Sequence, residues 1–148
     1  MIAAIALLLS VSDGADWSAY KPVPAATAWV EAAIVEGSDF TIEAANVKYT
    51  ITAPYTGEHR EMLAPRRELY RRWAKALGHP PSSADLCSHE IEIRVGTDRY
   101  WLPLQNVLLG PFAAEAVRGS RLQLRIMYIG AVGAERVFMI NSFEVRKP

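Results

Sequence analysis

Residues 89–105, HEIEIRVGTDRYWLPLQ, decide how the fold is predicted. Apolar Ile91 and Ile93 alternate with charged Glu90 and Glu92, and this period of two is typical of a strand with one face in the core. Glycine, threonine and aspartate follow as a short turn, and the alternation then resumes. The stretch predicts an antiparallel hairpin with Glu90 and Glu92 on the face toward water.

Three further stretches show the same alternation. Residues 46–52, 122–128 and 137–145 each show apolar side chains at alternate positions, with Asn141 as the polar exception, so each predicts a strand. Pro54 follows the first of them and is expected to end it, because proline cannot donate a hydrogen bond to a strand ladder.

Two segments predict helices. Residues 65–77 carry apolar side chains at helical spacing, begin with a proline and are followed by Gly78, so they predict a long amphipathic helix. Residues 106–117 predict a short helix, interrupted near a Gly-Pro pair.

This order of elements predicts an α+β, mainly β fold. The expected architecture is a small antiparallel barrel with one long amphipathic helix and one short helix. In element order alone it resembles the OB-fold and SH3-like barrels. An OB-fold has a helix between its third and fourth strands, and residues 106–117 occupy that place.

The first residues predict export. Residues 2–11, IAAIALLLSV, have the length and apolarity of a signal-peptide core, and small residues follow. We therefore expect residues 1–15 to be a signal peptide cleaved near residues 12–16, and a periplasmic or secreted mature protein. Residues 16–27 are then an extended arm, and residues 28–148 a single barrel-like domain. The alternative is that the apolar run is an N-terminal strand or helix of the domain itself.

Composition narrows the functional classes. The chain of 148 residues has 16 basic and 16 acidic residues, so no global positive field attracts nucleic acid. Its single cysteine excludes a disulfide framework within the chain and a multi-cysteine zinc site. No apolar run has the length of a transmembrane helix. No histidine or cysteine spacing indicates a metal site, and no motif indicates a cofactor.

Two features predict a binding surface. One is an outward-facing aromatic and amide on a strand that contains a proline, which is typical of a strand edge. The other is the arginine-rich helix, whose guanidinium groups suit carboxylates and phosphates. The candidate residues are Trp101, Gln105, Arg66, Arg67 and Arg71. The alternatives are that the tryptophan is covered, and that the arginines form a solvated face or pair with Glu90 or Glu92.

Cys87 and His89 form a second, catalytic hypothesis. They lie two positions apart, so a regular strand would point both to the same face, where imidazole could activate the thiol. The alternative is a buried free thiol beside an unrelated histidine.

These observations predict a function in broad terms. The chain is expected to be an exported interaction or binding module whose ligand is an unknown protein or envelope component. One alternative is a small thiol-dependent or hydrolytic enzyme that uses Cys87 and His89. The other is an OB-like nucleic-acid or oligosaccharide binder, which the placement of the basic residues on a helix disfavours.

Overall fold

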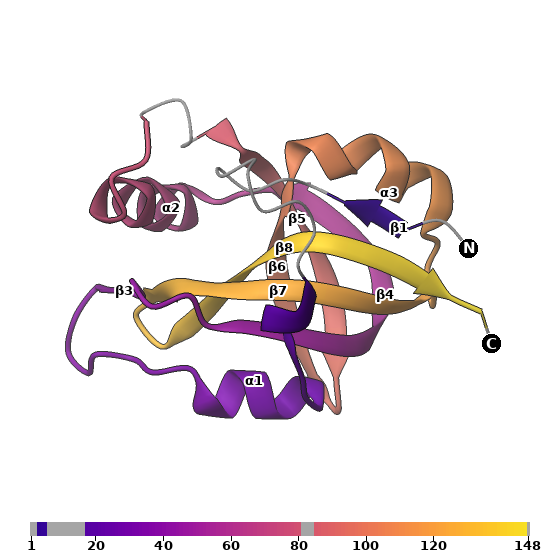
Figure 1. Ribbon diagram of the computed structural model, residues 1–148, viewed down its shortest axis with the longest axis horizontal. Coiled ribbons are helices and arrows are strands. Elements are labelled where there is room, and N and C mark those ends of the chain that lie inside the picture. The colour runs from indigo at the N-terminus through magenta and orange to yellow at the C-terminus, as the bar shows by residue number, and fades with distance from the viewer. Residues whose placement is uncertain (1–2, 6–16, 81–84, 148) are drawn as a thin grey trace.

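The computed structural model describes residues 3–5, 17–80 and 85–147 (Figure 1). Within them the fold is mostly β, as predicted, with three α-helices. The strands are β1 (Ala3–Ile5), β2 (Lys21–Pro22), β3 (Phe40–Ile42), β4 (Lys48–Glu61), β5 (Cys87–Val95), β6 (Asp98–Gln105), β7 (Arg121–Val132) and β8 (Glu135–Arg146). The helices are α1 (Ala25–Glu31), α2 (Ala64–Ala76) and α3 (Leu109–Glu115).

The long strands pair in an order that returns to its starting point. β4 pairs with β5, β5 with β6, β6 with β8, β8 with β7, and β7 with β4. Every one of these pairings is antiparallel except β6–β8, which is parallel and has a single register position, Leu104 opposite Ile140. β1 adds to β8, β3 adds to β7, and β2 runs parallel to β4.

β4 is longer than the sequence predicts. The expectation that Pro54 ends the strand is wrong, because β4 continues to Glu61. Pro54 is the last residue of β4 in register with β7, and Tyr55 is the first in register with β5. The proline therefore lies where β4 changes partner, a place where a missing ladder donor costs little.

Two apolar clusters hold these elements together. The larger lies between the strands and under α3, and includes Ile51, Ile93, Leu124 and Phe143. The smaller lies between α2 and the outer faces of β7 and β8, with Trp73 at its centre. The helix predicted over residues 65–77 is thus confirmed, and its apolar stripe covers the sheet.

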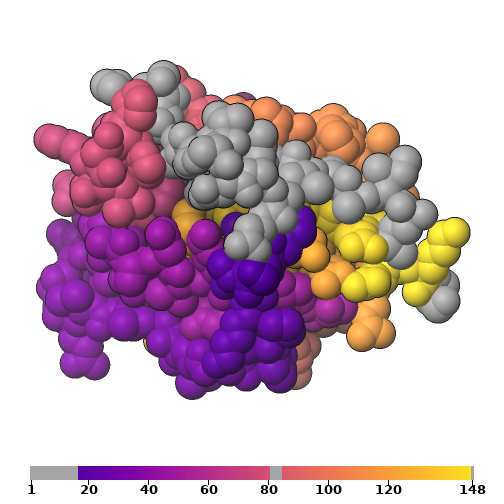
Figure 2. Space-filling model, in the orientation of Figure 1, coloured from indigo at the N-terminus to yellow at the C-terminus, as the bar shows by residue number. Residues whose placement is uncertain are grey.

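The three helices lie in different places around the sheet. α2 and α3 are at opposite ends of the upper side in Figure 1, and α1 lies below. In the space-filling view the pink atoms of the α2 region are at the upper left and the orange atoms of the α3 region at the upper right (Figure 2). The short helix predicted over residues 106–117 is confirmed as a 3-10 turn, Asn106–Leu108, followed by α3.

The predicted signal peptide, residues 1–15, lies almost entirely outside the described residues and stays a prediction. The predicted boundary between arm and domain at residue 28 falls inside α1. In the part of the chain that the structure describes, no helix is both long and apolar enough to cross a membrane.

Candidate functional site

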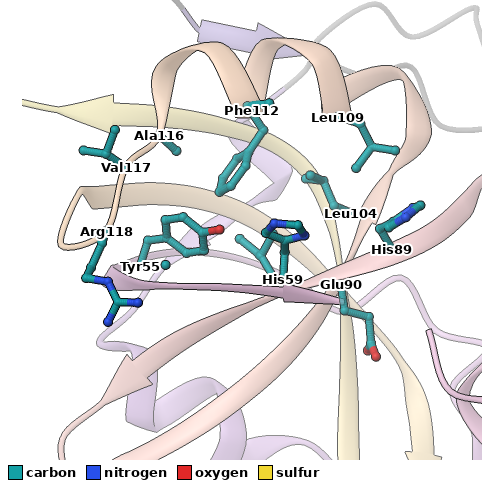
Figure 3. Close-up of a pocket in the computed structure, with 13 residues that line it drawn as sticks. Tyr55, His59, His89, Glu90, Leu104, Leu109, Phe112, Ala116, Val117 and Arg118 are labelled. Carbon is teal, nitrogen blue, oxygen red and sulfur yellow. The ribbon is translucent and has the colours of Figure 1, made fainter. Parts of the chain in front are cut away.

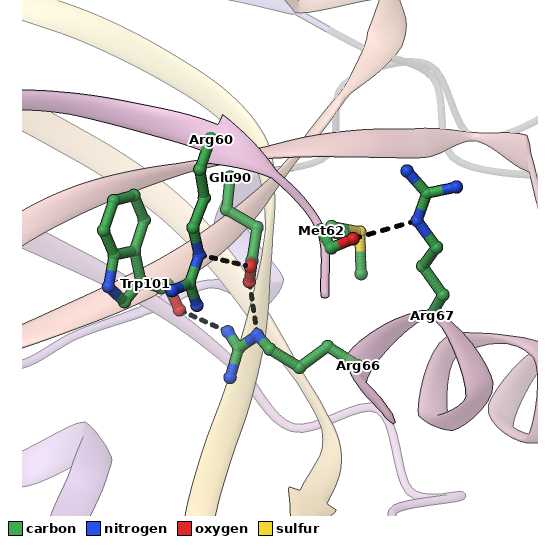
Figure 4. A network of polar contacts seen from close by, with 6 residues as sticks. All are labelled: Arg60, Met62, Arg66, Arg67, Glu90 and Trp101. Atoms are coloured by element: carbon green, nitrogen blue, oxygen red, sulfur yellow. Dashed lines mark hydrogen bonds and ion pairs between the residues drawn. The ribbon is translucent and has the colours of Figure 1, made fainter. Parts of the chain in front are cut away.

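Glu90 is the centre of a buried charge network. Its side chain is 0% exposed, although the hairpin pattern predicts that it faces water. The Nε group of Arg66, on α2, donates to Glu90 Oε2 at 2.5 Å. The Nε group of Arg60, on β4, donates to Glu90 Oε1 at 3.2 Å (Figure 4). Two guanidinium groups thus replace the water that the carboxylate lost.

Glu92, on the same face, is also buried. It accepts a hydrogen bond from Thr56 Oγ1 at 2.8 Å, and Arg99 lies 3.8 Å away. The prediction that Glu90 and Glu92 face water is therefore wrong. Alternation correctly places them opposite the apolar face, but it cannot show that α2 and β4 side chains cover them.

Trp101 belongs to the same network. Arg66 Nη2 donates to the carbonyl oxygen of Trp101 at 2.6 Å. The guanidinium carbon of Arg60 lies 4.1 Å from the centroid of the Trp101 ring, within cation–π range. The structure thus joins two predicted candidates, Arg66 on the helix and Trp101 on the strand, in one site.

A groove of about 290 Å³ opens beside Trp101, and we call it the β6 groove. Its walls come from α1, α2, β6 and the turn between β7 and β8. The lining residues are Trp29, Arg66, Arg99, Tyr100, Trp101, Ala134, Glu135 and Arg136. The lining contains three arginines and one glutamate, and Arg66 is paired with Glu90 outside the lining.

Aromatic rings form one wall of the groove. The rings of Trp29 and Tyr100 stack with centroids 4.5 Å apart. Trp29 is buried, and its Nε1 has no hydrogen-bond partner among the described residues. A buried N–H without a partner is costly, so an acceptor supplied by a ligand would be favourable there.

The β6 groove runs along an unpaired strand edge. Opposite residues of an antiparallel ladder alternate between hydrogen-bonded and non-bonded pairs. Pro103 has no N–H, so its pair with β5 is a non-hydrogen-bonded one. Trp101, two residues earlier, has the same orientation, so its backbone N–H and carbonyl point away from β5. The Arg66 contact to the Trp101 carbonyl fits this orientation. Before Leu104, no described strand pairs with this edge of β6.

The other candidate surface residues are not at the groove. Arg67 points away from Arg66 and Trp101 and donates to the carbonyl of Met62 at 3.0 Å (Figure 4). Arg71 is exposed and pairs with Glu68 on its own helix. The expectation that Gln105 faces outward is wrong.

Gln105 is buried and donates to Asn141 Oδ1 at 2.9 Å. The register shift lies in β5, between Cys87 and His89, and leaves the alternation of β6 unchanged. Gln105 is therefore covered and not turned: its partner Asn141 lies on β8 and donates in turn to Tyr20 Oη at 2.7 Å.

The same register shift separates Cys87 from His89. The extra residue in β5 means that the two side chains no longer share a face. Cys87 packs in the smaller cluster beneath α2, whereas His89 lines a different cavity next to α3. His89 Nδ1 lies 2.8 Å from Ser88 Oγ. The described structure therefore does not assemble a thiol–imidazole pair.

We expect the Cys87 thiol to react with a disulfide reagent such as DTNB much more slowly in the folded protein than in urea. Burial, reinforced by the nearby Glu90 charge, raises the pKa of this thiol. Above about pH 8.5 the unfolded chain loses the thiol proton that the folded protein keeps, and this loss favours the unfolded chain. The free energy of unfolding is therefore expected to fall as pH rises past that value. Labelling at the same rate in both states would contradict the burial of Cys87.

Metal ligation has no support in the described residues. No group of three or more His, Cys, Asp or Glu side chains there could hold a metal ion.

Comparisons with known proteins give no relative. No family model matches the chain, and no curated protein or solved structure matches it.

Trp29, Arg99 and Arg136 are among the groove residues that the sequence did not single out. Trp29 lies in a stretch whose residues favour helix and strand about equally, so its burial had no periodic signal. Arg99 and Arg136 lie close to hairpin turns, at positions where a solvated charge is the ordinary expectation. Only the approach of the two hairpins brings these arginines together.

Proposed function

We propose that the chain is an exported protein-interaction module that binds an extended acidic segment of a partner along the β6 groove. The observation that carries this proposal is the unpaired edge of β6 beside three arginines and Trp101.

The strand order supports an OB-like barrel as the scaffold. Taking β4, β5, β6, β7 and β8 as strands one to five, the third and fifth strands pair in parallel, and α3 lies between the third and fourth. OB-folds are partly open five-stranded barrels that bind ligands on the face of strands two and three, between the first and last connecting loops. In this chain α2 and the β7–β8 turn occupy those two connections, and both line the groove.

An extended peptide suits the open edge. A peptide strand added to a sheet edge gains main-chain hydrogen bonds, and side-chain pockets give it specificity. The outward N–H of Trp101 supplies a donor, and the Trp101 ring supplies an apolar contact. The first half of β6 is thus a template for one further strand.

Charge favours an acidic peptide. Arg66 is neutralised by Glu90, but Arg99 has a side chain that is 59% exposed and only a distant partner in Glu92. Arg136 donates from Nε to the backbone carbonyl of Ala32. No carboxylate among the described residues forms an ion pair with its guanidinium group. Carboxylates on a bound strand would pair with Arg99 and Arg136.

The test is fluorescence polarisation with a labelled octapeptide of alternating glutamate and valine. We expect saturable binding that weakens as the salt concentration rises. Arg99→Ala is expected to bind the peptide about fivefold more weakly, because it removes one exposed charge contact. Arg121→Ala removes an exposed arginine outside the groove and is expected to bind as the native protein does.

Two matched probes separate strand addition from simple charge attraction. The same peptide with methyl groups on alternate amides of one edge keeps its charge but cannot pair with β6, so we expect it to lose binding. A single-stranded oligothymidylate tests the nucleic-acid alternative. Equal binding of the methylated peptide, or tighter binding of the oligonucleotide, would contradict the proposal.

A further inference from the structure

A second cavity lies on another side of the sheet, between α3 and strands β4 and β5. Its volume is about 510 Å³, within the range of small-molecule sites, and it is open to solvent. We call it the α3 cavity (Figure 3). The lining residues are Tyr55, Gly57, His59, His89, Glu90, Ile91, Leu104, Leu109, Phe112, Ala113, Ala116, Val117 and Arg118.

The walls of the α3 cavity are apolar and held in place. Phe112 is buried and lies edge-on to Tyr55, with ring centroids 5.0 Å apart and planes at 79°. Behind it, Phe112 packs against Phe143 of the larger core at 5.1 Å. Leu104 and Leu109 add aliphatic surface. An apolar ligand body would therefore enter a site that already has its shape.

Basic side chains line the α3 cavity beside the apolar wall. Figure 3 shows His59 and His89 on one side of the apolar wall and Arg118 on another. His59 is exposed. Arg118 has one acidic neighbour, Glu58 at 3.4 Å, and both side chains are exposed, so this pair is weak.

The one acidic residue of the lining does not offset these groups. The Glu90 side chain points away from the α3 cavity, toward Arg60 and Arg66 (Figures 3 and 4). A ligand in the cavity therefore meets the backbone of Glu90 and not its charge.

Gly57 allows Arg118 to reach the cavity mouth. The β4–β5 register shifts between Tyr55 and His59, and Gly57 lies in this bulge with φ +93°. A Cβ atom at Gly57 would lie 2.9 Å from the Cβ of Arg118, so only glycine leaves room for this approach.

We propose that the α3 cavity binds a small amphipathic carboxylate, with an aromatic or branched apolar body against Phe112 and the carboxylate at the rim that carries Arg118. The planar fork of the arginine side chain matches the two oxygens of a carboxylate. This site is separate from the β6 groove and does not depend on it.

The test is titration with 4-phenylbutyrate, followed by amide chemical shifts, with 4-phenylbutylamine as a probe of equal body and opposite charge. We expect the carboxylate to bind at least about tenfold more tightly than the amine, because an amine leaves the cationic rim unpaired. The amide signals of Leu109, Phe112 and Ala113 are expected to shift with the carboxylate.

Two pairs of variants test the location. Ala113→Phe fills the cavity mouth and is expected to weaken 4-phenylbutyrate binding about tenfold or more, whereas Ala114→Phe, on the same helix but outside the lining, leaves binding unchanged. Arg118→Gln is expected to weaken 4-phenylbutyrate binding about fivefold, and Arg121→Gln is expected to leave it unchanged. Absence of binding, equal binding of the amine, or equal effects of Ala113→Phe and Ala114→Phe would overturn the proposal.

Discussion

Replacing Glu90 by glutamine is expected to lower the free energy of unfolding by about 3 kcal/mol or more, since it leaves a buried arginine charge without its partner. The Arg66 side chain is only 5% exposed, so water cannot replace the lost carboxylate. Arg60 loses the same partner, although its side chain is more exposed. Urea denaturation followed by far-UV circular dichroism measures the change.

Two comparisons show whether burial is the cause. Glu68→Gln removes an exposed carboxylate that pairs with Arg71 and Arg72 on α2, and it should change stability by less than about 1 kcal/mol. The double variant Glu90→Leu with Arg66→Met removes both members of the buried pair and should be more stable than Glu90→Gln. If Glu90→Gln and Glu68→Gln had equal small effects, the buried network would be wrong.

Trp73→Ala is expected to destabilise the fold by about 3 to 5 kcal/mol. Trp73 is 1% exposed and lies at the contact of α2 with β7 and β8, next to Tyr70 at a centroid distance of 5.5 Å. Alanine would leave a large cavity in the smaller cluster, because helix and sheet cannot both move to fill it. Thermal unfolding and urea denaturation should agree on the loss.

Val107→Ala is the control for this substitution. Val107 is 63% exposed in the turn before α3, so its truncation should change stability by about 0.5 kcal/mol or less. A near-neutral Trp73→Ala would mean that the apolar stripe of α2 does not pack on the sheet.

The elements with strong periodicity could be predicted from the sequence. The alternation around Ile91 and Ile93 and the apolar stripe around Trp73 each gave the correct element. In both cases a local pattern is sufficient, because the period of the apolar residues reflects one buried face.

The candidate site depends on contacts that no local pattern contains. The extra residue of β5 near Cys87 reverses which face the thiol occupies, and nothing in the sequence signals it. The local sequence predicts Glu90 to be a solvated strand residue, and only its contact with Arg66 of α2 shows that it is buried. The sequence did indicate that Arg66 could bridge to the hairpin, but not that Trp101 would accept a hydrogen bond from the same guanidinium.

The proposed function requires the β6 groove to bind an acidic peptide strand. The chain has 4 tryptophans, so its ¹H–¹⁵N spectrum should show one indole signal for each, which makes them reporters of separate places. On titration with the glutamate–valine octapeptide, we predict that the indole signals of Trp101 and Trp29 shift and saturate together. The indole signal of Trp73, which is buried between α2 and the sheet, is predicted to stay in place. If the Trp101 and Trp29 signals remained unchanged at saturating peptide, the groove would not be the binding site and the proposed function would be wrong.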